Sequence, residues 1–339
     1  MGLTGWEREL PDLIQYAVPG FVLLVALEAA ADAVMRRDLY EIKDTAASLT
    51  MGVGNLLVNL LAKALQFAIF SMLHRFAIFH IGYQWWAWAL IFFADDFTYY
   101  WFHRVSHESR LFWASHVVHH SSQRYNLSTA LRQTWTGSFM GFVFWLWMPV
   151  VGFPPAMILT IGALSLLYQF WIHTELIRTL GPFERILNTP SHHRVHHGSN
   201  PKYIDRNHGG TLILWDKLFG TYEPEDPEDA PRFGLTTNIN TYNPVRIAFH
   251  EWVDMGRDVW NAPGWRNKLR YAFGNPAWAT GTPRGDASIG VLEVSCDRIE
   301  SRTNRSLGAD GTSRACRRYR PLFMGTGLVV SPERVKNRE

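Results

Sequence analysis

Long apolar stretches alternate with polar segments in the first half of the chain. Residues 13–35, 51–73 and 84–102 are apolar on every helical face, and each is near the roughly 20 residues that a bilayer-spanning helix needs. A surface helix of a soluble domain shows an apolar stripe beside a polar face instead. The pattern therefore predicts three membrane-spanning helices, with buried helices of a large soluble core as the alternative.

A fourth apolar stretch, residues 138–172, is too long for one span. Its middle carries residues that interrupt helices: Pro149, Gly152, Pro154 and Pro155. The stretch is therefore predicted to form two helices folded as a hairpin. Because an even number of crossings returns the chain to its starting side, the polar segments before and after this hairpin are expected on the same side of the membrane.

Basic residues near the span ends predict the orientation. The loop MRRDLYEIKD and the segment after the third stretch are rich in Arg and Lys, whereas residues 74–83 carry Arg75 alone. Because basic loops stay in the cytoplasm, the first two segments are predicted to be cytoplasmic. Residues 174–275 are polar, with Gly and Pro punctuation, and predict a cytoplasmic cap of short helices and loops. The expected location is the inner or plasma membrane of a bacterium, or the endoplasmic reticulum of a eukaryote.

This domain is predicted to span residues 1–275, and residues 276–339 are predicted to form a separate tail. The start, MGLTGWERELPD, lacks the basic residues and cleavage site of a secretory signal, so we expect it to be retained. Residues 276–339 are rich in Arg, Ser and Gly without periodicity, which predicts disorder. The abrupt change motivates the hypothesis of a shifted reading frame or an unrelated extension. Resequencing of the end of the gene that finds an intact reading frame would exclude the frameshift hypothesis.

Composition excludes two classes of site. The net charge is only +3, and no basic stripe interleaves with stacking aromatic residues, so we expect no nucleic-acid partner. The two cysteines, Cys296 and Cys316, lie in the tail. Neither a disulfide framework nor a thiolate zinc site is indicated.

Histidines form three clusters between the apolar stretches and the cap. They are His103 and His107; His116, His119 and His120; and His193, His196 and His197. Residues three or four apart share a helix face, so each cluster is expected to aim its imidazoles at one point. A catalytic zinc ion takes three protein ligands, so eight histidines exceed the needs of one ion. The clusters predict a binuclear metal site, assembled by an all-α membrane fold.

Several chemistries fit such a site. Imidazole suits zinc, copper, iron and nickel, so ligand type does not choose the metal. Two adjacent redox metals at a membrane suggest dioxygen chemistry on a lipid. The alternatives are bis-histidine haem, a binuclear zinc hydrolase acting on lipids, and a membrane metal-binding protein without turnover.

Residues near the clusters supply further candidates. Asp96 lies seven residues before His103, so a continuous helix places both on one face. Acids inside spans are costly and tend to be functional, and we expect Asp96 to orient a ligating imidazole. Asp95 points elsewhere and is predicted to be structural. Glu108 is a metal ligand, a proton relay or a surface charge. His173, which closes the apolar hairpin, is a candidate ninth ligand.

The remaining histidines and aromatic residues have weaker predictions. His192 and His208 are expected to support the site or the fold, and His74, His80 and His250 are unassigned. A group of aromatic residues in the third stretch either lines a lipid path or anchors the helix at the membrane interface: Trp85, Trp86, Trp88, Tyr99, Tyr100 and Trp101.

Over roughly residues 40–225 the chain resembles the superfamily of fatty acid hydroxylases and sterol desaturases, which are membrane di-iron enzymes. The resemblance rests on the segments DDFTYYWFHRVSHE, ASHVVHHSSQRYNLSTALRQ and NTPSHHRVHHGSNPKYIDRNHGGTLILWDKLFGTYEPE. Within that superfamily, YNLSTALRQ and YQFWIHTE read like the branch that oxidises alkylglycerol ether lipids.

The resemblance implies a fold, a set of ligands and an activity. The eight clustered histidines would bind two iron ions, and Glu108 would be important. The enzyme would use O2 to hydroxylate a lipid C–H bond, with cleavage of an alkylglycerol ether to a fatty aldehyde and a glycerol derivative as one outcome. A sterol or fatty-acyl hydroxylase or desaturase is the alternative with the same site. The implied partners are a lipid from the bilayer and an external electron donor, for which tetrahydrobiopterin is one candidate.

Overall fold

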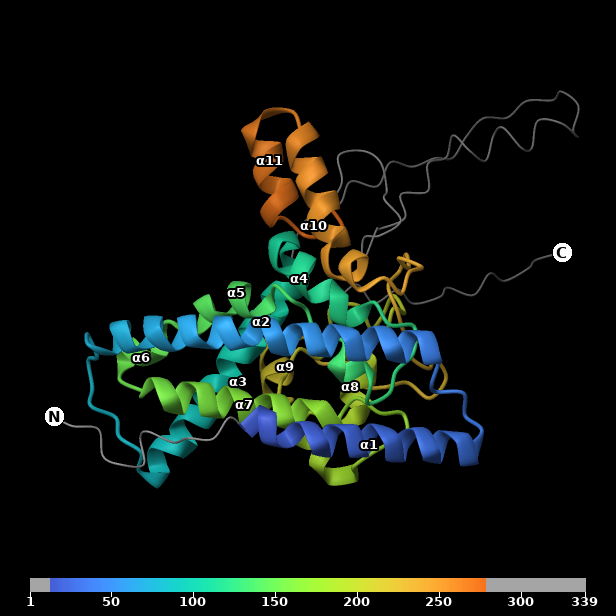
Figure 1. Cartoon of the computed structure of the whole chain (residues 1–339), viewed down its shortest axis with the longest axis horizontal. Helices are drawn as coiled ribbons and strands as arrows, with labels where there is room; N and C mark the ends of the chain where they lie inside the picture. Colours follow the sequence, from blue (N-terminus) through green and yellow to red (C-terminus); the bar gives the residue numbers. More distant parts are fainter. Residues whose placement is uncertain (1–12, 279–339) are drawn as a thin grey trace, which may run out of the picture. The chain divides into compact units, whose positions relative to one another are not determined.

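The computed structural model describes residues 13–278, and within these the regular structure is helical, with one isolated β-bridge between Leu187 and Leu212 (Figure 1). The all-α prediction is confirmed for this range. The α-helices are α1 (Leu13–Met35), α2 (Ile42–His74), α3 (Trp85–Glu108), α4 (Arg110–His120), α5 (Gly137–Gly141), α6 (Trp147–Val151), α7 (Pro155–Trp171), α8 (Pro190–His196), α9 (Leu214–Phe219), α10 (Pro244–Asn261) and α11 (Gly264–Phe273). Short 3₁₀ helices are η2 (Thr129–Leu131), η3 (Phe142–Trp145) and η4 (Gly181–Arg185).

Two of these helices, α1 and α2, are long and apolar enough to cross a membrane. Only 11% of the apolar window of each is buried, and leucines such as Leu23, Leu57 and Leu60 point outward. An exposed apolar surface of this extent is typical of a contact with a membrane or another protein. The third predicted span corresponds to α3, which is long enough but less apolar because Asp95, Asp96 and its Tyr and Trp residues interrupt it. That span stays a prediction.

The break predicted inside residues 138–172 is confirmed. The backbone turns at Gly152, whose φ of +128° favours glycine. Pro155 then occupies the first turn of α7, where proline is tolerated. The arm before the turn is not one helix but the succession of α5, η3 and α6. Both arms are shorter than the roughly 20 residues of a full span, so the number of crossings stays a prediction.

A hydrophobic core joins the long helices. In Figure 1, α1, α2 and α7 run along one direction, and α7 packs against α1, α2 and α3. The core residues come from α2, α3, α6, α7 and the turn before α7: Phe70, Ala87, Ile91, Met148, Phe153, Met157, Ile158 and Ile161. This packing fixes α3 in the bundle, so its C-terminal end, which carries two of the clustered histidines, has a defined position.

Buried carboxylates tie the loops to the helices. Glu28 of α1 accepts hydrogen bonds from the Leu127 backbone N–H at 2.7 Å and from the Tyr40 hydroxyl at 2.5 Å. It also accepts from the hydroxyl of Thr174, which follows His173 in the chain. A buried carboxylate is stable only when such donors surround it. Glu28 therefore holds α1 against the loop before η2 and against the end of the hairpin.

The cap begins after α7 and ends with α10 and α11, which contact α4. Residues 174–275 contain loops, short helices and the 18-residue helix α10. That they form a cytoplasmic cap stays a prediction. The first twelve residues and everything from residue 279 onward lie outside the described residues, and so do the predictions made for the tail and for its two cysteines.

Candidate metal centre

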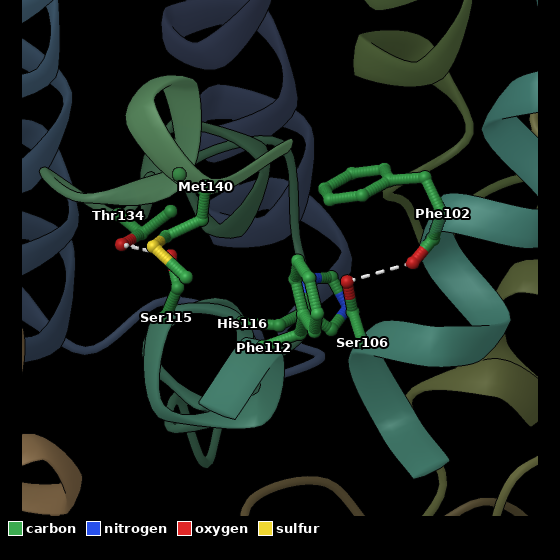
Figure 2. Close-up of a pocket in the computed structure, with 8 residues that line it drawn as sticks. Phe102, Ser106, Phe112, Ser115, His116, Thr134 and Met140 are labelled. Carbon is green, nitrogen blue, oxygen red and sulfur yellow. Dashed lines mark hydrogen bonds between the residues drawn. The ribbon is translucent and has the colours of Figure 1, made fainter. Parts of the chain in front are cut away.

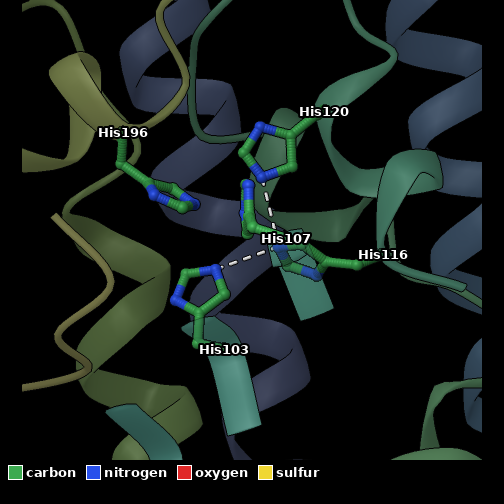
Figure 3. Close-up of side chains that lie close together, drawn as sticks. All are labelled: His103, His107, His116, His120 and His196. Atoms are coloured by element: carbon green, nitrogen blue, oxygen red, sulfur yellow. Dashed lines mark hydrogen bonds between the residues drawn. The ribbon is translucent and has the colours of Figure 1, made fainter. Parts of the chain in front are cut away.

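The structure gathers the nine candidate histidines into two adjacent groups. The five-histidine group, shown in Figure 3, consists of His103, His107, His116, His120 and His196. The four-histidine group consists of His119, His173, His193 and His197. Within each group, one ring nitrogen per residue lies within 4.8 Å of all the others. Eight of the nine side chains are buried, and His116 is partly exposed.

The clusters on α4 and α8 are each divided between the two groups. His116 and His120 of α4 face the five-histidine group, whereas His119 faces the other. On α8 the division is reversed, because His193 and His197 share the four-histidine group while His196 leaves it. The expectation that each cluster aims at one point is therefore wrong for these two. Neighbouring residues on a helix point about 100° apart, so an HxxHH segment naturally serves two sites.

The spacing of the ring nitrogens fits metal ions. His116 Nε2 lies 2.9 Å from His103 Nε2 and 3.1 Å from His120 Nε2. In the other group, His173 Nε2 lies 3.0 Å from both His119 Nε2 and His193 Nε2. Two imidazole nitrogens bound at about 2.1 Å to one ion and at right angles would be about 3.0 Å apart.

Among the buried ring nitrogens without a hydrogen-bond partner, three are Nε2 atoms of the two groups. They are Nε2 of His107, His196 and His197. A buried polar nitrogen without a partner is costly and needs an explanation. Since each belongs to one of the two groups, a bound metal ion is the partner that their chemistry fits.

Backbone carbonyls fix the orientation of several rings through the other nitrogen. Each of four histidines places Nδ1 near a carbonyl oxygen: His103 near His208 at 2.8 Å, His119 near Arg132 at 3.3 Å, His173 near Gln169 at 2.7 Å, and His196 near Arg206 at 2.9 Å. When Nδ1–H donates to the carbonyl, the lone pair remains on Nε2. This arrangement presents Nε2 as a metal ligand.

Burial keeps the imidazoles neutral. It lowers the pKa of His119 to about 4, and it lowers the pKa of His116, His120, His193 and His197 well below the ordinary value of histidine. Neighbouring imidazoles of the same site add to the effect, because two positive charges at this separation repel. Neutral imidazole is the form that binds metal, so the site is prepared for ions at neutral pH.

Asp205, which the sequence analysis did not select, contacts the five-histidine group. Its Oδ1 lies 3.3 Å from Nδ1 of His107 and has no hydrogen-bond partner. The residue has a left-handed backbone, with φ of +55°, and its carbonyl lies 3.1 Å from His208 Nε2. Burial raises the pKa of this carboxyl to about 7, and the charge of Glu108 adds to the effect. The one signal in the sequence was an acid beside the turn-forming segment RNHGG.

Asp96 supports the site less directly than predicted. Its carboxylate accepts hydrogen bonds from the backbone N–H of Thr211 at 2.6 Å and Leu212 at 3.1 Å, and from Trp215 Nε1 at 2.9 Å. No imidazole is among its partners, so the expectation that it orients one directly is wrong. The loop that it holds begins at His208, whose carbonyl faces His103. Asp96 therefore acts through this loop.

Asp95, by contrast, meets the expectation of a structural role. Its Oδ1 accepts a hydrogen bond from Trp145 Nε1 at 2.7 Å. This contact fastens α3 to the end of η3. It leaves Asp95 outside both histidine groups.

Glu108 lies at the end of α3, outside both groups. Its side chain is 48% exposed and accepts a hydrogen bond from Arg104 Nε at 2.8 Å. Of the alternatives weighed from the sequence, this placement favours a surface charge. His192 also lies outside the groups, buried beside Tyr222. The ring of His208 contacts His107, with 5.0 Å between ring centroids, which agrees with a supporting role.

A cavity adjoins the five-histidine group at His116 (Figure 2). Its lining combines apolar side chains with hydroxyl groups: Phe102, Ser106, Phe112, Ser115, Thr134, Gly137 and Met140. The Ser106 hydroxyl donates to the Phe102 carbonyl at 2.8 Å, which leaves the cavity wall largely apolar in character. The cavity has a volume of about 20 Å³, room for about one water-sized molecule, so it gives His116 a small and largely apolar neighbourhood.

Comparisons with known proteins agree with this site. Residues 88–221, which include both histidine groups, match the family model described as fatty acid hydroxylase. The chain is 40% identical over 291 residues to alkylglycerol monooxygenase of Homo sapiens, which covers 85% of this chain and 64% of that protein. The corresponding protein of Xenopus tropicalis is 40% identical over 279 residues, covering 82% and 62%. This chain thus spans less than two thirds of the length of these relatives.

A more distant relative is named for a different lipid. Ornithine lipid hydroxylase OlsE of Rhizobium tropici is 28% identical over 145 residues, covering 42% of this chain and 44% of that protein. No solved structure matches the chain.

Proposed function

Because this chain belongs to the fatty acid hydroxylase superfamily, we propose that it is a membrane-bound lipid monooxygenase with a di-iron site. The observation that carries the proposal is the pair of buried histidine groups, with nine ring nitrogens placed at ligand spacing. The five-histidine group would hold one ion and the four-histidine group the other. Iron ions bound there would supply the activation of dioxygen, which is the co-substrate.

The protein supplies orientation, neutral ligands and exclusion of water. Backbone carbonyls and Asp205 face the Nδ1 atoms, so the Nε2 atoms are held toward the centre of each group. Burial excludes water from eight of the nine imidazoles, which protects a strong oxidant from side reactions. The water-sized cavity at His116 has Phe102, Phe112 and Met140 in its wall, and the lipid would approach from this side once the wall opens further.

We propose an alkylglycerol ether lipid as the substrate class, supported by the name of the relatives that match most of this chain. One oxygen atom of O2 would enter the C–H bond next to the ether oxygen, and the other would leave as water with two electrons and two protons from an external donor. The resulting hemiacetal breaks into a fatty aldehyde and a glycerol derivative. Tetrahydrobiopterin is a candidate donor. Fatty-acyl hydroxylation is the second candidate, favoured by the match to the fatty acid hydroxylase family model.

The proposed topology places both histidine groups on the cytoplasmic side. Two observations support it. Helices α1 and α2 are apolar enough to span a bilayer, and basic residues gather where they meet, with Arg36 and Arg37 in the loop and Lys43 in the first turn of α2. The lipid would then reach the site from the bilayer, and the electron donor from the cytoplasm.

The test is metal analysis followed by an oxygen-dependent assay. Chain produced in iron-57 medium should contain about two iron ions and give a coupled binuclear Mössbauer signal, because the structure offers two histidine groups. Alkylglycerol should then yield fatty aldehyde only when O2 and a donor are present. Turnover that persists without O2 in a zinc-loaded protein would overturn the proposal in favour of a hydrolase.

A further inference from the structure

Helix α10 carries an apolar stripe that faces away from the protein. Val245, Phe249, Val253 and Trp260 are 58%, 38%, 56% and 82% exposed. At 100° per residue, these four positions fall within an arc of about 80° on the helix. The stripe is therefore continuous along the helix rather than a set of scattered apolar residues.

Helix α11 repeats the pattern. Trp265, Leu269 and Phe273 are 66%, 49% and 56% exposed, and their spacing of four residues also places them within about 80°. None of the residues of α11 is buried. Two consecutive helices thus expose apolar stripes of the same kind, which marks an interaction surface.

The opposite face of α10 is already committed to packing. Arg110 of α4 donates from Nε to Glu251 at 2.6 Å and from its guanidinium NH1 to Asp258 at 2.9 Å. Ile247 and Ala248 pack in a core cluster with residues of α2 and α4. The exposed stripe is therefore not needed to hold the hairpin, and the hairpin is fixed to the helix that carries three of the site histidines.

Basic residues accompany the stripes. Arg246, Arg266 and Arg270 each follow a stripe residue directly in the chain, and the two helices also carry Arg257 and Lys268. Of the three acidic residues of these helices, two are the partners of Arg110, and Asp254 pairs with Arg257 at 3.1 Å. The outer surface of the hairpin is therefore apolar with a positive border, which complements an anionic lipid surface.

The direction of the hairpin agrees with such a surface. In Figure 1, α10 and α11 run across the common direction of α1, α2 and α7. If α1 and α2 cross the bilayer, helices in this direction lie along its plane. Trp260 and Trp265 flank the turn between them, and tryptophan favours the boundary between headgroups and acyl chains.

We propose that the α10–α11 hairpin lies in the interface of an anionic phospholipid bilayer. The two apolar stripes enter the acyl boundary, while the arginines extend their charged ends to the headgroups. Because Arg110 ties α10 to α4, this contact sets the depth of the histidine groups relative to the membrane surface. The inference concerns the placement of the protein and goes beyond the proposed activity.

Fluorescent labels measure the depth directly. The full chain, with Cys296 and Cys316 replaced by serine, carries a single NBD label at Phe249→Cys, Leu269→Cys or the control Asn261→Cys. Asn261 is exposed and lies outside the stripe of α10. In nanodiscs with one chain each, containing phosphatidylglycerol and a nitroxide-bearing lipid, we expect several-fold stronger quenching and a blue-shifted emission at the two stripe positions.

Two comparisons complete the test. A triple variant, Arg246→Gln, Arg266→Gln and Arg270→Gln, should weaken quenching in anionic discs but not in phosphatidylcholine discs; unchanged quenching would overturn the role of anionic headgroups. Equal quenching at all three label positions would overturn the interfacial placement. So would a blue shift at the stripe positions that appears only in discs with two chains, because the stripes would then contact a second chain. The readout is independent of turnover, so failure of this inference and failure of the proposed function are distinguishable.

Discussion

The two histidine groups both draw on α4 and α8 yet differ in their surroundings. The five-histidine group contains the partly exposed His116, adjoins the cavity and includes a contact between His107 and Asp205. All members of the four-histidine group are buried. The Nδ1 atoms of His119 and His173 lie near backbone carbonyls, as do those of His103 and His196 in the other group, but within the described residues no carboxylate forms an ion pair or hydrogen bond with the four-histidine group. One group is open toward an apolar space, and the other is closed.

The difference indicates a division of labour between the proposed metal ions. Backbone carbonyls hold a ring without adding charge, whereas a carboxylate makes the imidazole that it faces a stronger ligand. The open group is therefore where we expect the lipid to approach, from the side of the small cavity at His116. The closed group would complete the binuclear site without contacting the substrate.

The largest expected effect comes from removing one ligand from each group separately. The rings of His120 and His197 lie 4.3 Å apart, but they belong to different groups. For His120→Ala and for His197→Ala we expect activity to fall by more than about 100-fold, beyond the loss that follows removal of a partner outside the ligand set. Iron content should drop from about two ions to about one per chain in each variant, because the other group stays intact.

The matched control is His80→Ala, which removes an exposed histidine outside both groups. It should keep two iron ions and normal activity. Iron quantification and Mössbauer spectra of the three variants decide the outcome. If either ligand variant retains both ions with an unchanged spectrum, the assignment of its histidine is wrong.

His173→Ala tests the closed group at a histidine that lies outside the three clusters of the sequence. His173 Nε2 lies 3.0 Å from the Nε2 atoms of His119 and His193. We expect activity to fall about 100-fold, which is the upper end of the loss caused by removing a residue that only supports a ligand. Iron should be retained more weakly in this group alone. Chelator titration measures the retention. The control is His192→Ala, which removes a buried histidine outside both groups. It should lose packing but keep its iron, so it separates metal loss from a general loss of packing.

Residue spacing predicted which histidines meet, but not how they divide. Positions three and four apart share a helix face, so the sequence spacing was enough to predict which histidines belong to the metal site. The division of HxxHH segments between two groups depends on where a second helix packs, as His120 and His197 illustrate with ring planes only 23° apart. That packing is a tertiary property which helical spacing alone does not contain.

The errors on the acidic residues have a similar cause. Asp96 shares a helix face with His103, as predicted, but its carboxylate is taken by backbone donors of a loop more than a hundred residues later. Asp205 reaches His107 from such a loop, through a left-handed backbone that no periodicity reveals. Helix faces were predictable here, whereas contacts supplied by irregular loops were not.

Asp205→Asn should affect the open group and spare the closed one. The amide keeps the shape of the side chain but lacks the negative charge that faces His107 Nδ1. We expect metal affinity at the open group to fall by about 10- to 100-fold, the usual effect of losing such a partner. Loss of iron to a chelator, followed by Mössbauer spectroscopy, should show one labile and one retained ion.

Glu108→Gln is the matched control for Asp205, because it removes a nearby carboxylate that is half exposed and paired with Arg104. We expect unchanged iron retention. Equal loss of iron in both variants would mean that the general negative charge, rather than the contact with His107, matters. It would also restore Glu108 as a residue of the site, as the family resemblance implies.

The smallest expected effect comes from filling the cavity beside His116. Met140 lies in its wall, and Met140→Trp would occupy space next to the open group only. Because the site loses room rather than a ligand, iron content should stay at about two per chain, while kcat/KM for a lipid substrate falls about 10-fold, as for a misfit in an apolar pocket. Phe139→Trp enlarges the neighbouring residue, which is exposed, and should leave kcat/KM unchanged. Equal kcat/KM in both variants would show that the lipid does not approach through this cavity, and the distinction between an open and a closed group would lose its functional meaning.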